Sequence, residues 1–357
     1  MTRRPRSTSA WLLRLAGRVL ALVLLALLPL APAAFAAQAE VAKPVARAAI
    51  ATLADAAAEV DPGSFEAFDL DWLDSTRQRA VPVRLYWPVR ASTGAKLPLV
   101  VFSHGIGGSR RGYSYLGAYW ASQGYASLHL QHVGSDRELW FGNPLSLLGR
   151  LQGAAQDREA IDRVKDLRFA LDQLLASERG ARIDARRIVA AGHSYGANTT
   201  MLAAGARVTR SGQLVDLHDP RIAAAVLISA PPFYGQADTT AILQTLRVPS
   251  LHITATEDVI RIPGYYSGSN DRVAVFDAVG SSRKVLAMFD GGSHSMFTDR
   301  AGSGGAALNP QVKSATRQLA LAFFRSVFDG SDVALHEWPR RFAPIVSRFV
   351  NQPAAGF

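Results

Sequence analysis

Short apolar segments recur along the chain from about residue 65, and amphipathic segments separate them. Seven of the apolar segments have the length and the Val, Ile, Leu and Phe content of β-strands: residues 81–89, 97–104, 125–133, 187–194, 222–230, 250–258 and 284–292. Several are apolar at almost every position. This is typical of strands in a sheet that is covered by helices on both faces.

The clearest amphipathic segment is residues 157–178, in which apolar side chains recur at helical spacing: Ile161, Val164, Leu167, Leu171 and Leu174. Strands that alternate with helices predict a mainly parallel central sheet, and so an α/β fold. We expect one such domain over residues 62–330. An alanine-rich spacer or helix at residues 37–61 precedes it, and we expect the tail at residues 331–357 to dock on it.

Residues 1–36 begin with basic side chains, continue with an apolar run over residues 19–30, and end with small residues. This is the layout of a secretory signal peptide, and cleavage after Ala36 or after Ala39 fits it. An uncleaved membrane anchor is the alternative. Because the apolar run is shorter than the ~20 residues of a bilayer span, the sequence favours export to a periplasm or the medium over stable membrane anchoring.

The composition narrows the classes of function. The formal net charge is +10, but five of the arginines lie in residues 1–36, which contain no Asp or Glu. The rest of the chain does not alternate basic clusters with aromatic residues, so we do not expect nucleic-acid binding. The chain has no cysteine, which excludes structural disulfides and a lipoprotein anchor. The oligomeric state stays open.

The segment Gly192-His193-Ser194-Tyr195-Gly196 joins a predicted strand to a segment that is compatible with a helix. Glycine is unfavourable inside either element, so two glycines around one serine indicate a tight turn in which side chains would be obstructed. A serine between a strand and a helix in such a turn is typical of a nucleophile elbow. A glycine-rich turn with an incidental serine is the alternative.

A serine nucleophile needs a histidine base and an acid that orients it, and in the strand–elbow–helix pattern both follow the serine in the chain. His294 is the candidate base because it follows a predicted strand and lies in a glycine-rich loop. Asp258 is the preferred acid, after the strand at residues 250–258. Its neighbour Glu257 and Asp290, which lies close to His294 in sequence, are alternatives.

Attack by serine on a carbonyl also requires two N–H donors for the oxyanion. The amide of Tyr195, directly after the serine, is one candidate. The turn at residues 104–108 supplies the other, with Ile106 as the first choice and Gly107 as the second. A phosphate-binding loop is the alternative for this turn, but no Gly-Lys-Ser/Thr ending follows it.

Three aromatic residues near the predicted catalytic edge of the sheet are candidates for substrate contact: Trp140, Phe233 and Phe297. A buried aromatic anchor is the alternative for Trp140. His129 and His132 resemble a metal-binding pair, but no third ligand with suitable spacing is evident, and we expect no metal. No insertion of cap size separates the strands at 222–230 and 250–258, so we expect a cleft that only loops enclose.

Four segments occur in order after Val81: FSHGIGGSRRGYSYLGAYWASQGYASLHLQH, AAGHSYGANT, ITATEDVI and GGSHSMFTDR. Together they resemble the α/β-hydrolase superfamily, and most of all its predicted dienelactone-hydrolase and platelet-activating-factor-acetylhydrolase-like branch with polyester-cleaving relatives. The resemblance implies an α/β-hydrolase fold, Ser194 as nucleophile, Asp258 as acid, His294 as base and Ile106 as an oxyanion amide. Dienelactone hydrolases use cysteine, which this chain lacks.

These observations predict an exported, cofactor-independent serine hydrolase that acts on small-molecule carboxylic esters with short acyl or aryl groups. Two other functions use the same residues differently. An acyltransferase would pass the acyl group to an alcohol or glycan acceptor, and a binding protein would keep the fold without turnover.

Overall fold

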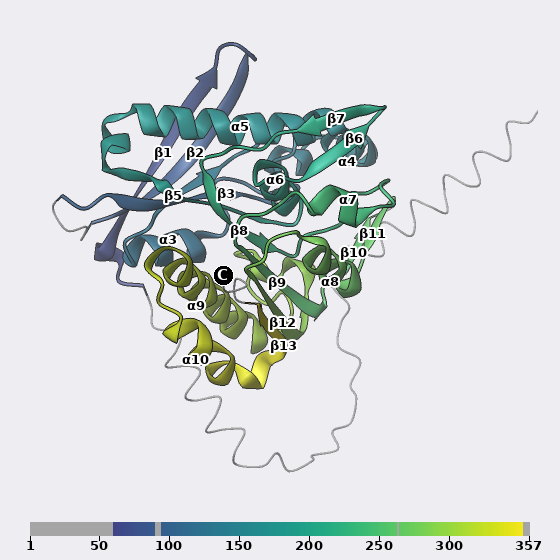
Figure 1. Ribbon diagram of the computed structural model, residues 1–357. Coiled ribbons are helices and arrows are strands. Elements are labelled where there is room, and N and C mark those ends of the chain that lie inside the picture. Colours follow the sequence, from purple (N-terminus) through teal and green to yellow (C-terminus); the bar gives the residue numbers. More distant parts are fainter. Residues whose placement is uncertain (1–59, 90–93, 263, 353–357) are drawn as a thin grey trace, which may run out of the picture. The chain divides into compact units, whose positions relative to one another are not determined.

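The computed structural model describes residues 60–89, 94–262 and 264–352 (Figure 1). Its main sheet has the strand order β1-β2-β4-β3-β5-β8-β9-β12-β13. The bounds are β1 Phe65–Asp74, β2 Arg79–Pro88, β3 Leu97–Ser103, β4 Ala126–Leu130, β5 Ile183–His193, β8 Ile222–Ile228, β9 Ser250–Glu257, β12 Lys284–Ser293 and β13 Val346–Gln352. The strands from β4 to β12 in this order pair in parallel, and β1, β2 and β13 pair antiparallel. The predicted α/β fold with a mainly parallel sheet is confirmed.

Helices cover both faces of the sheet, as Figure 1 shows. One apolar core contains side chains of α5 (Asp157–Ala176), α6 (Tyr195–Ala203), α7 (Thr239–Leu243) and α8 (Ser269–Ala278). The other contains side chains of α3 (Ser114–Ser122), α9 (Leu308–Asp329) and α10 (Val333–Arg341). In β3, Leu99 and Val101 face the first core while Val100 and Phe102 face the second. This alternation accounts for a strand that is apolar at every position.

The parallel arrangement brings the ends of β5, β9 and β12 to one edge of the sheet. β5 pairs with β8, β8 with β9, and β9 with β12, all in the same direction. Residues that directly follow β5, β9 and β12 therefore gather at one place although they are far apart in sequence.

Several elements were not predicted, among them the edge strand β1 and the long helix α9. Shorter examples are α4 (Leu147–Ala154), the hairpin of β6 (Arg207–Arg210) and β7 (Gln213–Asp216), and the hairpin of β10 (Ile260–Ile262) and β11 (Tyr265–Ser267). Short 3-10 helices are η1 Pro62–Ser64, η2 Arg137–Trp140, η3 Pro144–Ser146, η4 Glu178–Arg182, η5 His294–Phe297 and η6 Ala343–Ile345. The fold also continues past residue 330, because the tail contributes α10 and the edge strand β13.

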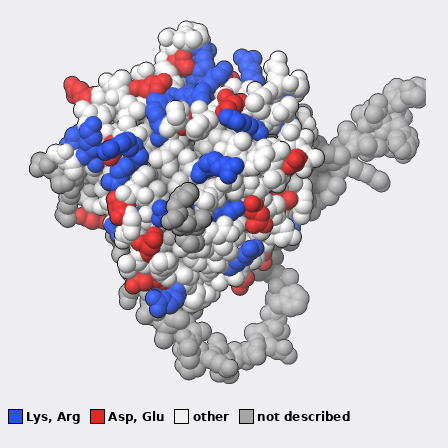
Figure 2. All heavy atoms as spheres, viewed as in Figure 1, with Lys and Arg blue, Asp and Glu red and all other residues white. Residues whose placement is uncertain are grey.

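Arginines on the surface are interspersed with carboxylates. On the face seen in Figure 2, basic groups are separated by acidic and uncharged ones. Several arginines form ion pairs, for example Arg84 with Asp69 at 2.8 Å and Arg207 with Asp216 at 2.8 Å. Among the described residues, no helix combines the length and apolarity that crossing a membrane requires. The signal peptide expected at residues 1–36 and the spacer up to residue 59 lie outside them.

Candidate active site

Ser194 lies in the turn between β5 and α6, with the backbone angles φ 55° and ψ −122°. This is a strained conformation for a residue with a side chain. Its amide donates to the carbonyl of Ile228 at 2.9 Å, which holds the turn against β8. The flanking glycines are sterically required. A Cβ at Gly192 would overlap the carbonyl of Gly196, and a Cβ at Gly196 would overlap the carbonyl of Ser103.

Asp258 and His294 follow β9 and β12, and both side chains reach the serine. The imidazole Nε2 of His294 lies 2.8 Å from Ser194 Oγ, and its Nδ1 lies 2.6 Å from Asp258 Oδ1. An ionised carboxylate only accepts hydrogen bonds, so Nδ1–H donates to Asp258. The free Nε2 lone pair is then directed at the serine hydroxyl. Glu257 and Asp290, the alternative acids, are exposed and make no such contact.

The carboxylate of Asp258 is completely buried and remains ionised. Burial opposes its ionisation, but the hydrogen bond from His294 and the positive charge of Arg272 hold the pKa of Asp258 well below its usual range. Thr254 donates a further hydrogen bond to Asp258 Oδ2 at 2.8 Å. The carboxylate therefore has fixed partners at both of its oxygens.

The turn at residues 104–108 contains the two alternatives for the second oxyanion donor, the amides of Ile106 and Gly107. Hydrogen bonding distinguishes between them. The Gly107 amide donates to the carbonyl of Ser135 at 2.8 Å, so it is already used. Ile106 lines the pocket that contains Ser194. Tyr195 is the first residue of α6, where an amide has no partner within the helix. Ile106 and Tyr195 are therefore kept as the two candidate oxyanion amides.

A chain of hydrogen bonds that sequence analysis missed joins this turn to the histidine loop. The Gly105 amide donates to Tyr113 Oη at 3.3 Å, and Tyr113 Oη lies 2.8 Å from His193 Nδ1. His193 Nε2 lies 3.0 Å from the carbonyl of His294, to which it donates. Burial lowers the pKa of His193 to about 3, so its ring stays neutral and keeps this donor–acceptor pattern. The position of His193 inside the glycine–serine motif was the one available sequence signal.

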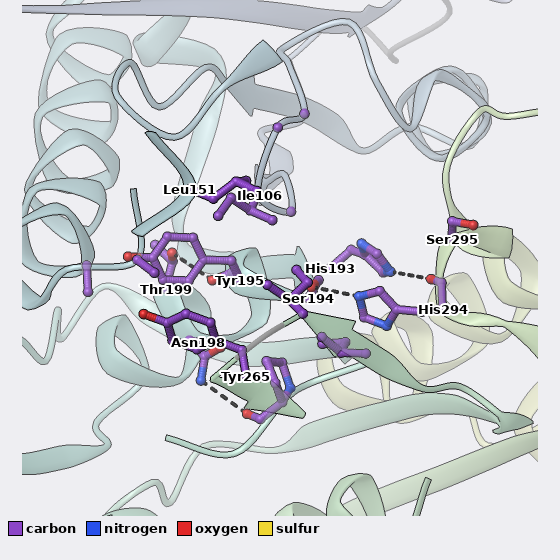
Figure 3. A pocket seen from close by; sticks show the side chains of 18 of the residues that line it. Ile106, Leu151, His193, Ser194, Tyr195, Asn198, Thr199, Tyr265, His294 and Ser295 are labelled. Atoms are coloured by element: carbon purple, nitrogen blue, oxygen red, sulfur yellow. Dashed lines mark hydrogen bonds between the residues drawn. The ribbon is translucent and has the colours of Figure 1, made fainter. Parts of the chain in front are cut away.

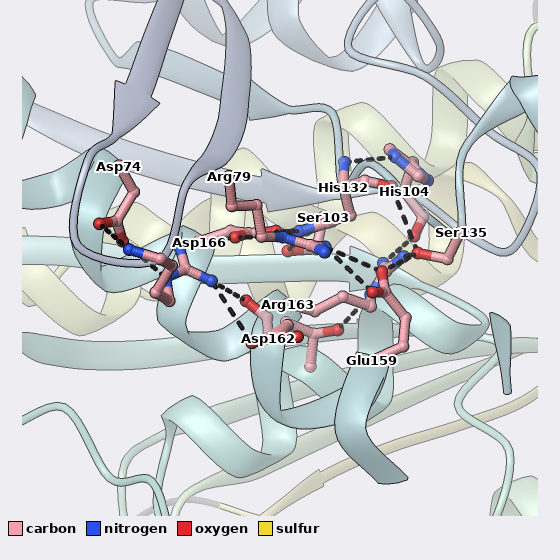
Figure 4. Close-up of polar contacts among 12 residues, drawn as sticks. Asp74, Arg79, Ser103, His104, His132, Ser135, Glu159, Asp162, Arg163 and Asp166 are labelled. Carbon is pink, nitrogen blue, oxygen red and sulfur yellow. Dashed lines mark hydrogen bonds and ion pairs between the residues drawn. The ribbon is translucent and has the colours of Figure 1, made fainter. Parts of the chain in front are cut away.

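Arg163 of α5 supports the same turn from beneath, within the polar network drawn in Figure 4. Its guanidinium is completely buried and donates to the carbonyl of His104, to Ser135 Oγ at 2.8 Å and to Thr199 Oγ1 at 2.9 Å. It also lies over the ring of Tyr195, 4.5 Å from the centroid. One buried cation therefore connects the oxyanion turn with the start of α6.

Ser194 and His294 open into a pocket of about 740 Å³. In Figure 3, Ile106 and Leu151 lie on one side of Ser194, and Asn198 and Tyr265 lie on the other. The expectation that only loops enclose the cleft is wrong, because α4 and the β10–β11 hairpin also line it. α4 is only eight residues long, so its helical period could not be recognised in the sequence.

The three aromatic candidates have different positions. Trp140 lines the pocket with its side chain partly exposed, and its Nε1 donates to the carbonyl of Gly107 at 2.9 Å. Phe233 also lines the pocket. Phe297 does not: it is completely buried in the core beside Phe289, with 6.2 Å between the ring centroids. Phe297 is the last residue of the short helix η5 that begins at His294, and its ring packs in the core instead of lining the pocket.

The two histidines that resembled a metal-binding pair have separate surroundings. His132 lies between Ser103 Oγ and Asp166 Oδ2, at 3.1 Å from each. His129 contacts Ser127 Oγ at 3.1 Å and stacks on Phe102. Within the described ranges, no three His, Cys, Asp or Glu side chains are placed to hold a metal ion.

Comparison with known proteins agrees with this architecture. The family model for platelet-activating factor acetylhydrolase, isoform II, matches residues 72–137, a segment that includes β2, β3, the oxyanion turn and β4. No curated protein matches the chain. The match and the mostly parallel α/β sheet together confirm the resemblance to the platelet-activating-factor-acetylhydrolase-like branch of the α/β-hydrolases, a branch of ester hydrolases.

Proposed function

We propose that this protein is a serine hydrolase of carboxylic esters that works through a Ser194–His294–Asp258 triad. The observation that carries the proposal is the unbroken series of hydrogen bonds from the strained serine through the imidazole to a buried carboxylate. His294 takes the proton of Ser194 Oγ while Oγ attacks the ester carbonyl carbon. The same proton then passes to the leaving alcohol, and an acyl-enzyme remains.

Water completes the reaction. His294 takes a proton from water, the resulting hydroxide attacks the acyl carbon, and Ser194 Oγ leaves with that proton as the carboxylic acid is released. In both steps the carbonyl oxygen becomes negative, and the amides of Ile106 and Tyr195 stabilise it. The use of the Gly107 amide by Ser135 supports Ile106 as the second donor.

The pocket supports a proposal about the substrate as well. Its volume lies within the range of sites for drug-sized ligands and exceeds what an acetyl ester alone requires. Apolar side chains such as Trp140, Phe233 and Leu151 contribute to its lining. We therefore assign it esters that pair a short acyl group with a bulky apolar or aryl group. The layout of residues 1–36 supports export of the chain before it acts.

The replacement Ser194→Ala tests the proposal. We expect it to lower the rate of nitrophenyl acetate hydrolysis by about 10³-fold or more, because the nucleophile is lost, while the circular dichroism spectrum is unchanged. Ser122→Ala, on α3 and outside the pocket, is the matched control and should keep full activity. A fluorophosphonate should label the native protein and the control but not Ser194→Ala. Full activity in Ser194→Ala would exclude the mechanism.

A further inference from the structure

A second buried cation lies next to the catalytic acid, outside the triad itself. Arg272 belongs to α8, and its side chain is only 2% exposed. Its Nε lies 3.5 Å from Asp258 Oδ2, while the other oxygen, Oδ1, accepts the hydrogen bond from His294. A buried guanidinium is costly unless a negative charge lies close to it. One oxygen of the Asp258 carboxylate therefore faces His294, and the other faces Arg272.

The same guanidinium is connected to the wall of the substrate pocket. Arg272 Nη1 donates to Ser267 Oγ at 2.9 Å, and Ser267 Oγ lies 2.7 Å from Tyr234 Oη. Ser267 is completely buried, whereas Tyr234 lines the pocket and meets Tyr265 edge-on, with 5.2 Å between the centroids. The polar contacts thus run from the pocket wall through Ser267 and Arg272 to the acid.

Other titratable groups lie around this acid and base, and Asp299 and Arg300, which follow His294 in the chain, line the same pocket with opposite charges. His193 of β5 lies 4.9 Å from the ring of His294 but stays neutral, because burial lowers its pKa to about 3. Burial raises the pKa of Tyr234, which is therefore neutral as well. Thr254 of β9 donates to Asp258 and carries no charge. Asp271, the residue before Arg272 on α8, accepts a hydrogen bond from the Gly268 amide and so caps its own helix.

We propose that Arg272 is a positioning residue of this hydrolase: it fixes the carboxylate of Asp258 and limits the pH range in which His294 acts as a base. The inference rests on the proposed function. The fixed positive charge favours the ionised carboxylate but disfavours a second positive charge on the imidazole. Without Arg272, the imidazolium form would persist to higher pH, and the acid would lose one of the contacts that orient it.

The test compares Arg272→Met, which removes the charge, with Arg272→Lys, which keeps it. The readout is the pH profile of kcat/KM for nitrophenyl acetate, with active sites counted by fluorophosphonate so that misfolded molecules do not contribute. We expect the acidic limb of Arg272→Met to move up by about one pH unit, because the imidazolium is no longer opposed by a nearby cation. Arg272→Lys should keep the limb of the native enzyme.

A purely structural role would not move this limb. Arg283→Met is the matched control: Arg283 donates to the carbonyl of Ser326 at 2.8 Å, outside the pocket, and its loss should lower stability without changing the profile. An unchanged limb in Arg272→Met would overturn the proposal. If the native enzyme is active and Ser194→Ala is not, that result refutes the role of Arg272 while the proposed triad stands.

Ser267→Ala keeps the inference testable if Arg272→Met does not fold. This variant removes the hydroxyl that Arg272 and Tyr234 share but leaves the charge in place. We expect kcat per active site to fall by about threefold to tenfold through poorer positioning, with the acidic limb unmoved. An unchanged kcat per active site in Ser267→Ala would contradict the positioning role.

Discussion

At the scale of single residues, the turn that holds Ser194 requires two neighbouring positions without a Cβ atom, Gly192 and Gly196. Ser194 occupies a backbone conformation that costs about 1–3 kcal/mol for a residue with a side chain. The hydrogen bond from its amide to Ile228 helps to maintain it. The turn also needs glycine at positions 192 and 196, because a methyl group at either would overlap a carbonyl. Steric exclusion, more than any attractive contact, explains the spacing of this motif.

A second property at this scale is that several histidines are buried without charge, which makes the stability of the fold depend on pH. Burial lowers the pKa of His129, His193 and His252 to about 3, against 6.5 for an exposed histidine. The unfolded chain therefore binds protons below pH 6.5 that the folded chain does not bind. Stability is fully present above pH 6.5 and is lost progressively as the pH falls from 6.5 toward 3.

His252 offers a clean test of this linkage because it lies in β9, away from the reacting atoms, where it contacts Ser250 Oγ at 3.1 Å. Between pH 7 and 5.5, each such histidine should lower the free energy of unfolding by about 1 kcal/mol. Denaturant unfolding should show that His252→Gln has a flatter pH dependence by this amount. His336→Gln, at an exposed position, should match the native slope. Equal slopes in both variants would contradict the argument.

At the scale of elements, α5 is more than a cover for the sheet. Arg163 on its buried side binds the carbonyl of His104 and the hydroxyl of Thr199, and so joins three elements that are distant in sequence. Removal of the guanidinium would leave these buried acceptors without a donor. The geometry of the oxyanion turn therefore depends on a helix that does not touch the substrate with this side chain.

Arg163→Met tests the connection. We expect the free energy of unfolding to fall by about 3 kcal/mol, because the partners of a buried charge become unpaired. We expect kcat to fall more than KM rises, since the turn acts mainly on the transition state. Arg158→Met, on the exposed side of the same helix with a side chain 95% exposed, is the control for helix propensity and should change neither quantity. A loss of stability without any loss of kcat would separate Arg163 from catalysis.

The periodic pattern of α5 could be predicted from the sequence, whereas the short elements beside the pocket could not. The amphipathic pattern over residues 157–178 corresponds to α5 at Asp157–Ala176. α4, by contrast, has only eight residues, and each strand of the β10–β11 hairpin has three. Contacts between side chains that are distant in sequence could not be predicted either. Tyr113 with His193 and Arg272 with Asp258 depend on packing that no local pattern encodes.

At the scale of the whole molecule, the segment from η2 to α4 partly covers the pocket and is held in place. Trp140 Nε1 donates to the carbonyl of Gly107, which attaches the segment to the oxyanion turn. Arg150 of α4 donates to the carbonyls of Leu139 and Asn143, both at 3.0 Å. The bonds of Arg150 hold the segment together as one unit, and the bond of Trp140 attaches this unit to the turn beside Ser194.

This arrangement leads to an expectation for kinetics at interfaces. Interfacial activation arises when a mobile lid opens at a lipid surface, so a segment that stays bonded to the turn through Trp140 should produce none. We expect the rate on nitrophenyl esters to saturate smoothly as the concentration passes the solubility limit of each ester, and to favour acetyl and butyryl over palmitoyl esters. Phe141 and Leu145 are exposed on the covering segment, where detergent could bind to them. The measurement should therefore use emulsions without detergent. A sudden rise in rate at the solubility limit, or an optimum at long chains, would mean that the hydrogen bond between Trp140 and Gly107 breaks during turnover and that the segment moves as a lid.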